Sequence, residues 1–257
     1  MSIQFIISGF AVGLLVGMTG VGGGSLMTPL LTLLFGVTPS VAVGTDLAFA
    51  SLTKGAGTVT HRLRGTVHWD IVRRLCMGAL PAALLATMAL HYVGPVSASI
   101  GKTIRYSIAV SVLLTVVAIL FRGKMLAWIN RHPERQLHGT RLTVATVVAG
   151  ALLGTLVTIS SIGAGAIGAT LLVMLYPKLT PAEVAGTDIA YAVPLTAIAA
   201  AGHWWLGSIN WMLLVTLLIG SVPGITIGSW AARAVPERFL RGLLAATLAL
   251  VAVKLLY

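Results

Sequence analysis

The chain has 257 residues, of which 57% are hydrophobic and only 9% are charged, and its mean hydropathy is +0.98. A soluble domain of this length needs far more polar surface, so the composition excludes one and predicts an all-α polytopic membrane protein in contact with the lipid bilayer. The net charge is +11, but the basic residues cluster between the apolar runs. This distribution is typical of cytoplasmic loops and argues against a nucleic-acid partner.

Ten apolar segments follow one another along the chain. They cover residues 3–19, 26–37, 41–59, 71–93, 104–121, 142–159, 166–176, 184–202, 209–233 and 239–256. A full crossing of a bilayer needs about 20 residues, so 26–37 and 166–176 are too short to span it unaided. We expect these two to form half-helices or the inner arms of re-entrant hairpins, within a total of about 8–10 transmembrane or half-membrane helices.

The two halves of the chain share residues at a constant spacing. Thirteen residues between positions 37 and 81 recur 142 positions later, among them Gly44-Thr45-Asp46 as Gly186-Thr187-Asp188, His61 as His203 and Trp69 as Trp211. A general bias toward Ala, Leu and Gly does not explain paired Asp, His and Trp. A duplicated membrane unit is typical of secondary transporters.

The duplication divides the chain into an N-terminal repeat (1–121), a basic linker (122–141) and a C-terminal repeat (142–257). The linker and the loop that carries Arg62 and Arg64 are rich in Arg, so we expect both to be cytoplasmic. The loop at 204–211, which is the repeat equivalent of the Arg62 loop, has no Lys or Arg and should face outward. Opposite charge asymmetry in the two halves predicts inverted repeats.

Glycine-rich breaks interrupt the apolar runs at equivalent places in the two halves. The first break contains Gly22, Gly23, Gly24 and Ser25, and the second contains Ser160, Ser161, Gly163, Ala164 and Gly165. A helix that begins after such a break directs its N-terminal amides back at it, which makes the break a candidate site for a small anionic substrate. The alternative is that these small residues only let two helices approach closely.

Asp46 and Asp188 each follow Gly-Thr in an otherwise apolar segment. A carboxylate at membrane depth is costly, so each is a candidate for binding a coupling proton or sodium ion, although either could instead cap an unwound helix. A charged aspartate would repel an anion. Thr45 and Thr187 are therefore the better candidates for direct contact with the substrate.

The histidine pair and one lysine complete the candidate residues. His61 and His203 have no Cys, Asp or Glu at metal-ligand spacing, so we expect no metal site, and the histidines either anchor the helix ends or contribute to substrate binding. Lys54 has no basic counterpart in the second half, and we expect it to snorkel to the cytoplasmic surface. No sequence of the Walker A, HExxH or Gly-x-Ser-x-Gly type is present, which argues against an enzyme, and no cofactor is expected.

The pattern GLLVGMTGVGGG at residues 13–24, then Pro29, then Val43-Gly44-Thr45-Asp46, then His61 and Gly65, resembles the sulfite exporter TauE/SafE family over essentially the whole chain. In the second half Ala164 and Ala166 replace glycines and Leu171 stands where Pro29 would fall. The resemblance implies a bacterial inner-membrane permease that transports sulfite, thiosulfate or an organosulfonate such as sulfoacetate. A passive anion channel, a carrier of another small organic carboxylate and a membrane scaffold are the alternatives. The sequence gives no oligomeric state.

Overall fold

The computed structural model of the chain describes residues 3–19, 24–93, 98–132 and 136–231, together with 242, 246 and 248. Within these ranges the chain is helical and contains no strand, which confirms the all-α prediction. The helices are α1 (Ile3–Thr19), α2 (Gly24–Leu34), α3 (Pro39–Leu63), α4 (Trp69–Val93), α5 (Ala98–Arg131), α6 (Gly139–Ser160), α7 (Ala166–Leu175), α8 (Pro181–Trp205) and α9 (Trp211–Ala231). The last predicted segment, 239–256, lies almost wholly outside the described residues.

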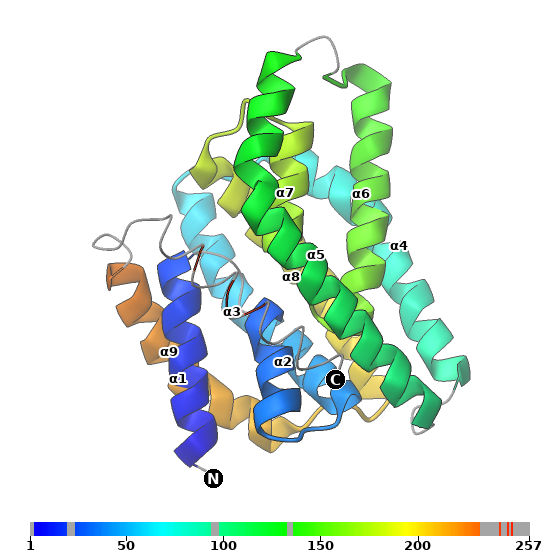
Figure 1. Ribbon diagram of the computed structural model, residues 1–257, viewed down its shortest axis with the longest axis vertical. Helices are drawn as coiled ribbons and strands as arrows, with labels where there is room; N and C mark the ends of the chain where they lie inside the picture. Colours follow the sequence, from blue (N-terminus) through cyan, green and yellow to red (C-terminus); the bar gives the residue numbers. More distant parts are fainter. Residues whose placement is uncertain are drawn as a thin grey trace.

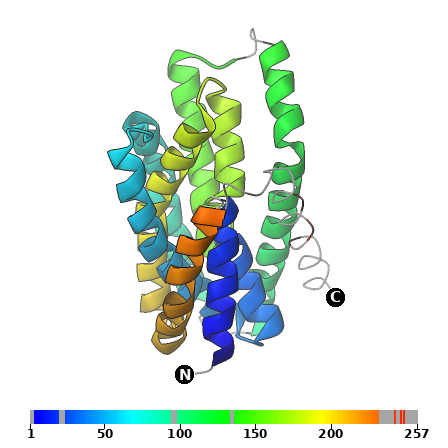
Figure 2. The same ribbon diagram turned by 90° about the vertical axis from the view of Figure 1, so that its left-hand side faces the viewer.

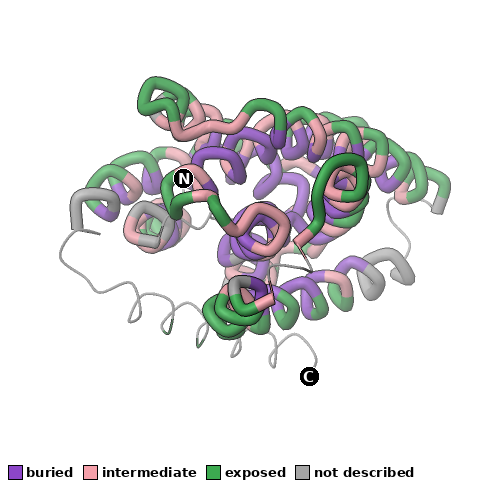
Figure 3. The backbone as a smooth tube through the Cα atoms, turned by 90° about the horizontal axis from the view of Figure 1, so that it is seen from above, coloured by how far each residue is buried: buried purple, intermediate pink, exposed green. Residues whose placement is uncertain are grey.

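Five helices, α4, α5, α6, α8 and α9, are long and apolar enough to cross a membrane. Their outward faces carry exposed large apolar side chains such as Leu85, Phe121, Leu152 and Ile219. In the view along the bundle the buried parts of the backbone gather in the centre and the exposed parts lie outside (Figure 3). Apolar side chains on an outer surface are favourable only where lipid replaces water, so the arrangement is that of a multi-pass membrane protein.

The two short helices run back along the helices that precede them. The ring of Phe35, directly after α2, lies 4.7 Å from the ring of Phe5 at the start of α1, so α2 ends where α1 began. In the second half the Tyr176 hydroxyl, directly after α7, bonds the hydroxyl of Thr146 in the early part of α6 at 2.8 Å. Both α1–α2 and α6–α7 are therefore helical hairpins.

The two hairpins enter the bundle from opposite ends. In Figure 1, α1 rises from the N-terminus at the bottom, whereas α6 descends from the top, where α5 ends. Figure 2, turned by 90°, shows the same opposition. Helices α3 and α8 pack against each other.

Glycines bring two helix pairs into backbone contact, α1 with α9 and α4 with α6. A Cβ atom at Gly9 would overlap the carbonyl oxygen of Leu217, and one at Gly150 would overlap the carbonyl oxygen of Leu75. Two further contacts recur in the same way. Gly13 lies against Ser221 as Gly154 lies against Ala79, and Gly220 lies against Ile6 as Gly78 lies against Val147. Equivalent positions of the two sequence repeats thus make equivalent contacts, and each hairpin packs on a helix of the other half.

Replacing Gly78 by Ala should destabilise the protein, because the new Cβ would overlap the Val147 carbonyl. Overpacking of this kind costs about 1–3 kcal/mol, and in a protein of this size each kcal/mol lowers Tm by roughly 2–4 °C. Gly123→Ala is the matched control, since nothing lies within 4 Å of its added Cβ and alanine favours the helix. Thermal unfolding of the detergent-purified variants measures both. A Tm for Gly78→Ala at or above that of Gly123→Ala would contradict the contact.

Candidate functional site

Three ionisable side chains from α3 and α8 lie in the interior of the bundle. Asp46 is 0% exposed, Asp188 is 4% exposed and Lys54 is 6% exposed. Ionisable groups at membrane depth are costly and face the bundle interior, where they pair with one another or with backbone groups. The partners of these three residues therefore decide what the centre of the molecule can do.

Asp46 is held from α2. The Thr28 hydroxyl donates to Asp46 Oδ2 at 2.6 Å, and both side chains are fully buried. The second carboxylate oxygen, Oδ1, has no hydrogen-bond partner among the described residues. The Ser161 hydroxyl lies near enough to act on the Asp46 carboxylate, yet its oxygen is also without a partner in the described part of the chain. Within the described chain, Oδ2 of Asp46 therefore has a hydrogen-bond donor, and Oδ1 is free to bind a proton or a ligand.

Lys54 points inward, so the prediction that it snorkels to the surface is wrong. Its ammonium donates to the carbonyl oxygen of Ala164, in the second glycine break, at 2.8 Å. The charges of Asp46 and Asp188 both act on Lys54, but within the described chain no ion pair of 4.0 Å or less joins it to either carboxylate. Inside the bundle the Ala164 carbonyl and the two carboxylates stabilise the Lys54 ammonium, as water does when a lysine reaches the surface.

Asp188 lies beside a tyrosine and a glycine. A Cβ atom at Gly168 would overlap Asp188 Oδ1 and lie 2.7 Å from the Tyr191 hydroxyl, so these two polar groups meet over α7 where that helix has no side chain. Asp188 Oδ1 and the Tyr191 hydroxyl are both buried without a partner in the described ranges. Unpartnered buried polar atoms cost free energy, and several in one place indicate a site for a ligand, a proton or water.

The second glycine break forms the wall of this centre. Residues 161–165 are all buried, and the backbone turns through positive φ values at Ser161 (58°), Gly163 (128°) and Gly165 (140°) before α7 begins. The Ser160 hydroxyl lies 2.7 Å from the Leu156 carbonyl oxygen and 3.0 Å from the Ser111 hydroxyl on α5, and its oxygen accepts from the Ile162 N–H of the break at 3.2 Å. Ser161, the one non-glycine residue with positive φ in the described chain, keeps its hydroxyl unpartnered there.

Of the first glycine break, Gly22 and Gly23 lie outside the described residues. Gly24 begins α2, and Ser25 lies in the first turn of that helix. Because Thr28 reaches Asp46 from one turn further along α2, the start of this helix also faces the central carboxylates.

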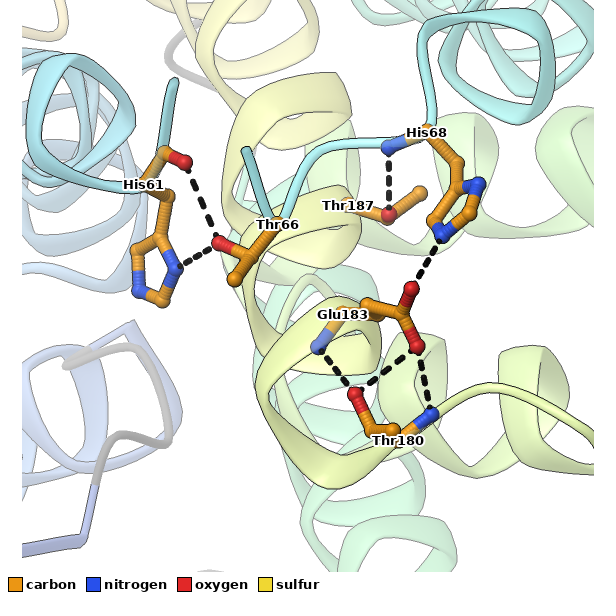
Figure 4. Close-up of polar contacts among 6 residues, drawn as sticks. All are labelled: His61, Thr66, His68, Thr180, Glu183 and Thr187. Atoms are coloured by element: carbon orange, nitrogen blue, oxygen red, sulfur yellow. Dashed lines mark hydrogen bonds and ion pairs between the residues drawn. The ribbon is translucent and has the colours of Figure 1, made fainter. Parts of the chain in front are cut away.

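Thr45 and Thr187 each hold a loop of the other half. The Thr187 hydroxyl oxygen accepts a hydrogen bond from the backbone N–H of His68 at 3.1 Å (Figure 4). The Thr45 hydroxyl oxygen accepts one from the backbone N–H of Asn210, also at 3.1 Å. The start of each central helix therefore contacts the loop after the other, which makes α3 and α8 antiparallel. This pair of contacts gives both Gly-Thr sequences a structural role.

The two histidines lie in different surroundings. His61 Nδ1 is 2.9 Å from the Thr66 hydroxyl (Figure 4), and its ring lines a cavity of about 550 Å³ between α3 and α9 together with Arg64. His203 is 1% exposed, and its Nε2 is 2.9 Å from the carbonyl oxygen of Thr158 on α6. Neither is in the group around Lys54, and no cluster of three or more His, Cys, Asp or Glu side chains occurs in the described ranges.

A hydrogen bond between side chains joins the loop after α3 to the start of α8. His68 Nε2 lies 2.9 Å from Glu183 Oε1, and Glu183 Oε2 also accepts from the Thr180 backbone N–H and hydroxyl in the capping box that begins α8 (Figure 4). Both side chains are partly exposed. The contact fixes the end of the bundle and lies apart from the central carboxylates.

Sequence reasoning singled out the two aspartates and Ser161 but missed Thr28, Tyr191 and the role of Lys54. The sequence did carry a signal for Tyr191 and Lys54, because at both positions the two halves have different side chains and one half has the additional polar or charged group. Tyr191 stands where the first half has Phe49, and Lys54 stands where the second half has Thr196.

The sequence pattern of the sulfite exporter TauE/SafE family matches residues 5–255 of the chain. The chain belongs to this family. A probable membrane transporter protein of Bacillus subtilis, YjnA, is 34% identical over 261 residues that cover the whole of both chains. A second one, YdhB, is 27% identical over 96% of this chain and 97% of its own length. A probable membrane transporter protein of Xylella fastidiosa is 25% identical over 89% of this chain and 85% of its own length.

No solved structure matches the chain. As a TauE/SafE protein with five apolar helices long enough to span a bilayer and with bacterial relatives, it is a multi-pass transporter of the bacterial inner membrane. The resemblance drawn from the sequence is confirmed.

Removing the Thr28 hydroxyl should cost far more stability than removing the Tyr191 hydroxyl. Thr28→Val deletes a hydrogen bond to a buried carboxylate, a loss of about 1.5–3 kcal/mol. Tyr191→Phe deletes a group without a partner among the described residues, so its effect on the free energy of unfolding should stay within about 0.5 kcal/mol. Thermal unfolding in detergent compares them. Equal destabilisation would mean that the Tyr191 hydroxyl has a structural partner.

Proposed function

We propose that the protein is a secondary transporter that moves a small sulfur-containing anion by alternating access around its two hairpins. The observation that carries the proposal is the group of Asp46, Lys54 and Asp188, buried where α3 and α8 meet the second glycine break. Two carboxylates and an ammonium add nothing to a scaffold that apolar side chains could not supply at lower cost. They are typical of an ion or proton pathway.

We infer that the two halves are inverted repeats, an arrangement that supports alternating access. Equivalent glycines make equivalent contacts in the α1–α9 and α4–α6 pairs, and Thr45 and Thr187 make equivalent contacts with opposite loops. Two units related by a two-fold axis in the membrane plane can expose a central site first to one side and then to the other. We assign residues 1–121 and 142–257 to these units.

The cytoplasmic end is the one that carries the linker and Arg62. Arg62 lies in the last turn of α3, and α3 ends toward the same end of the bundle as α5 (Figure 1). Lys and Arg collect on the cytoplasmic side. Trp204, Trp205 and Trp211, all well exposed, mark the opposite end, where aromatic side chains favour the membrane interface.

The substrate class rests on the family and on the polar groups of the centre. Sulfite is the substrate that the description of the family gives. The Lys54 ammonium and the Ser161 and Tyr191 hydroxyls are donors that suit the oxygens of sulfite, thiosulfate or a sulfonate, while Asp46 and Asp188 are the coupling groups. The same donors suit a carboxylate, so the test includes one.

Uphill uptake should depend on the central carboxylates. We would reconstitute the wild type and the Asp46→Asn/Asp188→Asn variant in proteoliposomes, and follow labelled sulfite, thiosulfate, sulfoacetate and acetate with and without a pH gradient or a sodium gradient. The wild type should accumulate a sulfur anion against its gradient, and the variant should not. Asp70→Asn is the matched control, because Asp70 is exposed at the start of α4 and should leave uptake unchanged.

Each result separates the candidate functions. Downhill flux in the wild type that no gradient can drive uphill would indicate a channel. Uphill flux at full strength in the double variant would reduce both aspartates to structural groups. Transport of acetate in place of every sulfur anion would replace the substrate class, and the absence of any flux would favour a scaffold.

A further inference from the structure

The central charges do not balance. With all three groups ionised, Asp46, Lys54 and Asp188 carry a net charge of minus one. The other titratable groups near them are Tyr191 on α8, the Cys76 thiol on α4, which lies near Tyr191, and Arg122 on α5. Arg122 acts on Asp188 less strongly than Lys54 does. Lys54 is thus the main positive charge near both carboxylates in the described chain.

Lys54 has capacity left for a ligand. An ammonium has three N–H donors, and the described residues give Lys54 one acceptor, the Ala164 carbonyl. The carboxylates lie near but beyond ion-pair distance. Around them, Asp46 Oδ1, Asp188 Oδ1 and the Ser161 and Tyr191 hydroxyls are buried without partners in the described residues. The Lys54 ammonium and these two hydroxyls can therefore donate hydrogen bonds to the oxygens of a bound anion.

We propose that Lys54 is the cationic ligand of the transported anion, and that the Asp46–Asp188 pair takes up one proton for each anionic charge that Lys54 binds. The inference rests on the proposed function and deepens it. An anion added to the ionised group would leave one ammonium to compensate three negative charges among buried side chains. Protonation of one carboxylate restores the net charge of minus one and turns an acceptor that repels the anion into an O–H donor.

A proton fits this centre better than a sodium ion does. Hard metal cations take several oxygen ligands at once, and a cation bound between the carboxylates would lie next to the Lys54 ammonium, which would repel it. A proton needs one carboxylate oxygen. Asp46 Oδ1 and Asp188 Oδ1 each offer one that is not already occupied by a donor in the described chain.

Binding of a fixed-charge anion should depend on pH. Methanesulfonate and thiosulfate keep their charge near neutral pH, so any pH dependence belongs to the protein. We would measure their Kd by calorimetry on the purified full chain. Coupling to one proton predicts that the Kd for methanesulfonate rises about tenfold per pH unit where the free carboxylates are ionised. In weak buffer, binding should also remove about one proton per methanesulfonate from solution.

Two variants separate Lys54 from the carboxylates. Asp188→Asn removes the excess negative charge, so binding should persist and its pH dependence should flatten. In the Lys54→Met/Asp188→Asn double variant one positive and one negative charge are lost. The net charge of the group therefore stays at minus one, as in the wild type. The affinity of this double variant should be at least about tenfold lower than that of Asp188→Asn alone. Lys124→Met, on the exposed surface of α5, is the control and should bind as the wild type does.

The outcomes are distinct. If the double variant binds as tightly as Asp188→Asn, or if the wild type binds without any pH dependence, the proposal is overturned while the proposed function stands. A Kd that depends on the sodium concentration and not on pH would contradict the proposal that the coupled ion is a proton. If the wild type binds neither methanesulfonate nor thiosulfate, the substrate class of the proposed function fails together with Lys54. Should the double variant not fold, the pH dependence and the proton count of the wild type still decide.

Discussion

The hydrogen bond from the Lys54 ammonium to the Ala164 carbonyl is the contact on which the centre of the molecule depends. It joins α3 of the first half to the glycine break of the second, 110 positions further along the chain. A lysine ammonium in the interior of a membrane protein is tolerated only with acceptors and negative charges close by. Asp46 and Asp188 supply the charges, and the unwound backbone at residues 161–165 supplies the acceptor. The helix break and the buried charges therefore require one another.

The reciprocal contacts explain why particular residues recur in the two halves. Gly-Thr recurs because each threonine accepts a hydrogen bond from the loop after the opposite central helix. Close approach at Gly44 and Gly186 accompanies these bonds, since a Cβ at either position would lie within 3 Å of atoms from that loop. The departures from the repeat, Lys54 and Tyr191, fall at the central charges. The recurring Gly-Thr residues thus hold the two halves together, and the two departures place further polar groups beside the recurring Asp46 and Asp188.

Much of the fold follows from the sequence, because hydropathy and glycine report local structure. The predicted segment 3–19 coincides with α1, and 166–176 exceeds α7 by one residue. The segment 104–121 is shorter than α5, which continues to Arg131, since a helix does not have to end where its side chains become basic. The partners of Lys54, Thr45 and Thr187 lie 110, 165 and 119 positions away, and no local pattern encodes such contacts. The acceptor of the Lys54 ammonium is not among its neighbours in the sequence, and for this reason the sequence predicted that the side chain reaches the cytoplasmic surface.

The glycine contacts also bear on the assembly of the two halves. Each hairpin is seated on a helix that belongs to the opposite half, α1 on α9 and α6 on α4. A single half would leave the glycine-lined faces of its own hairpin and of its own fourth helix uncovered. Each half therefore depends on the other to bury its closest helix contacts, and neither could complete its packing alone.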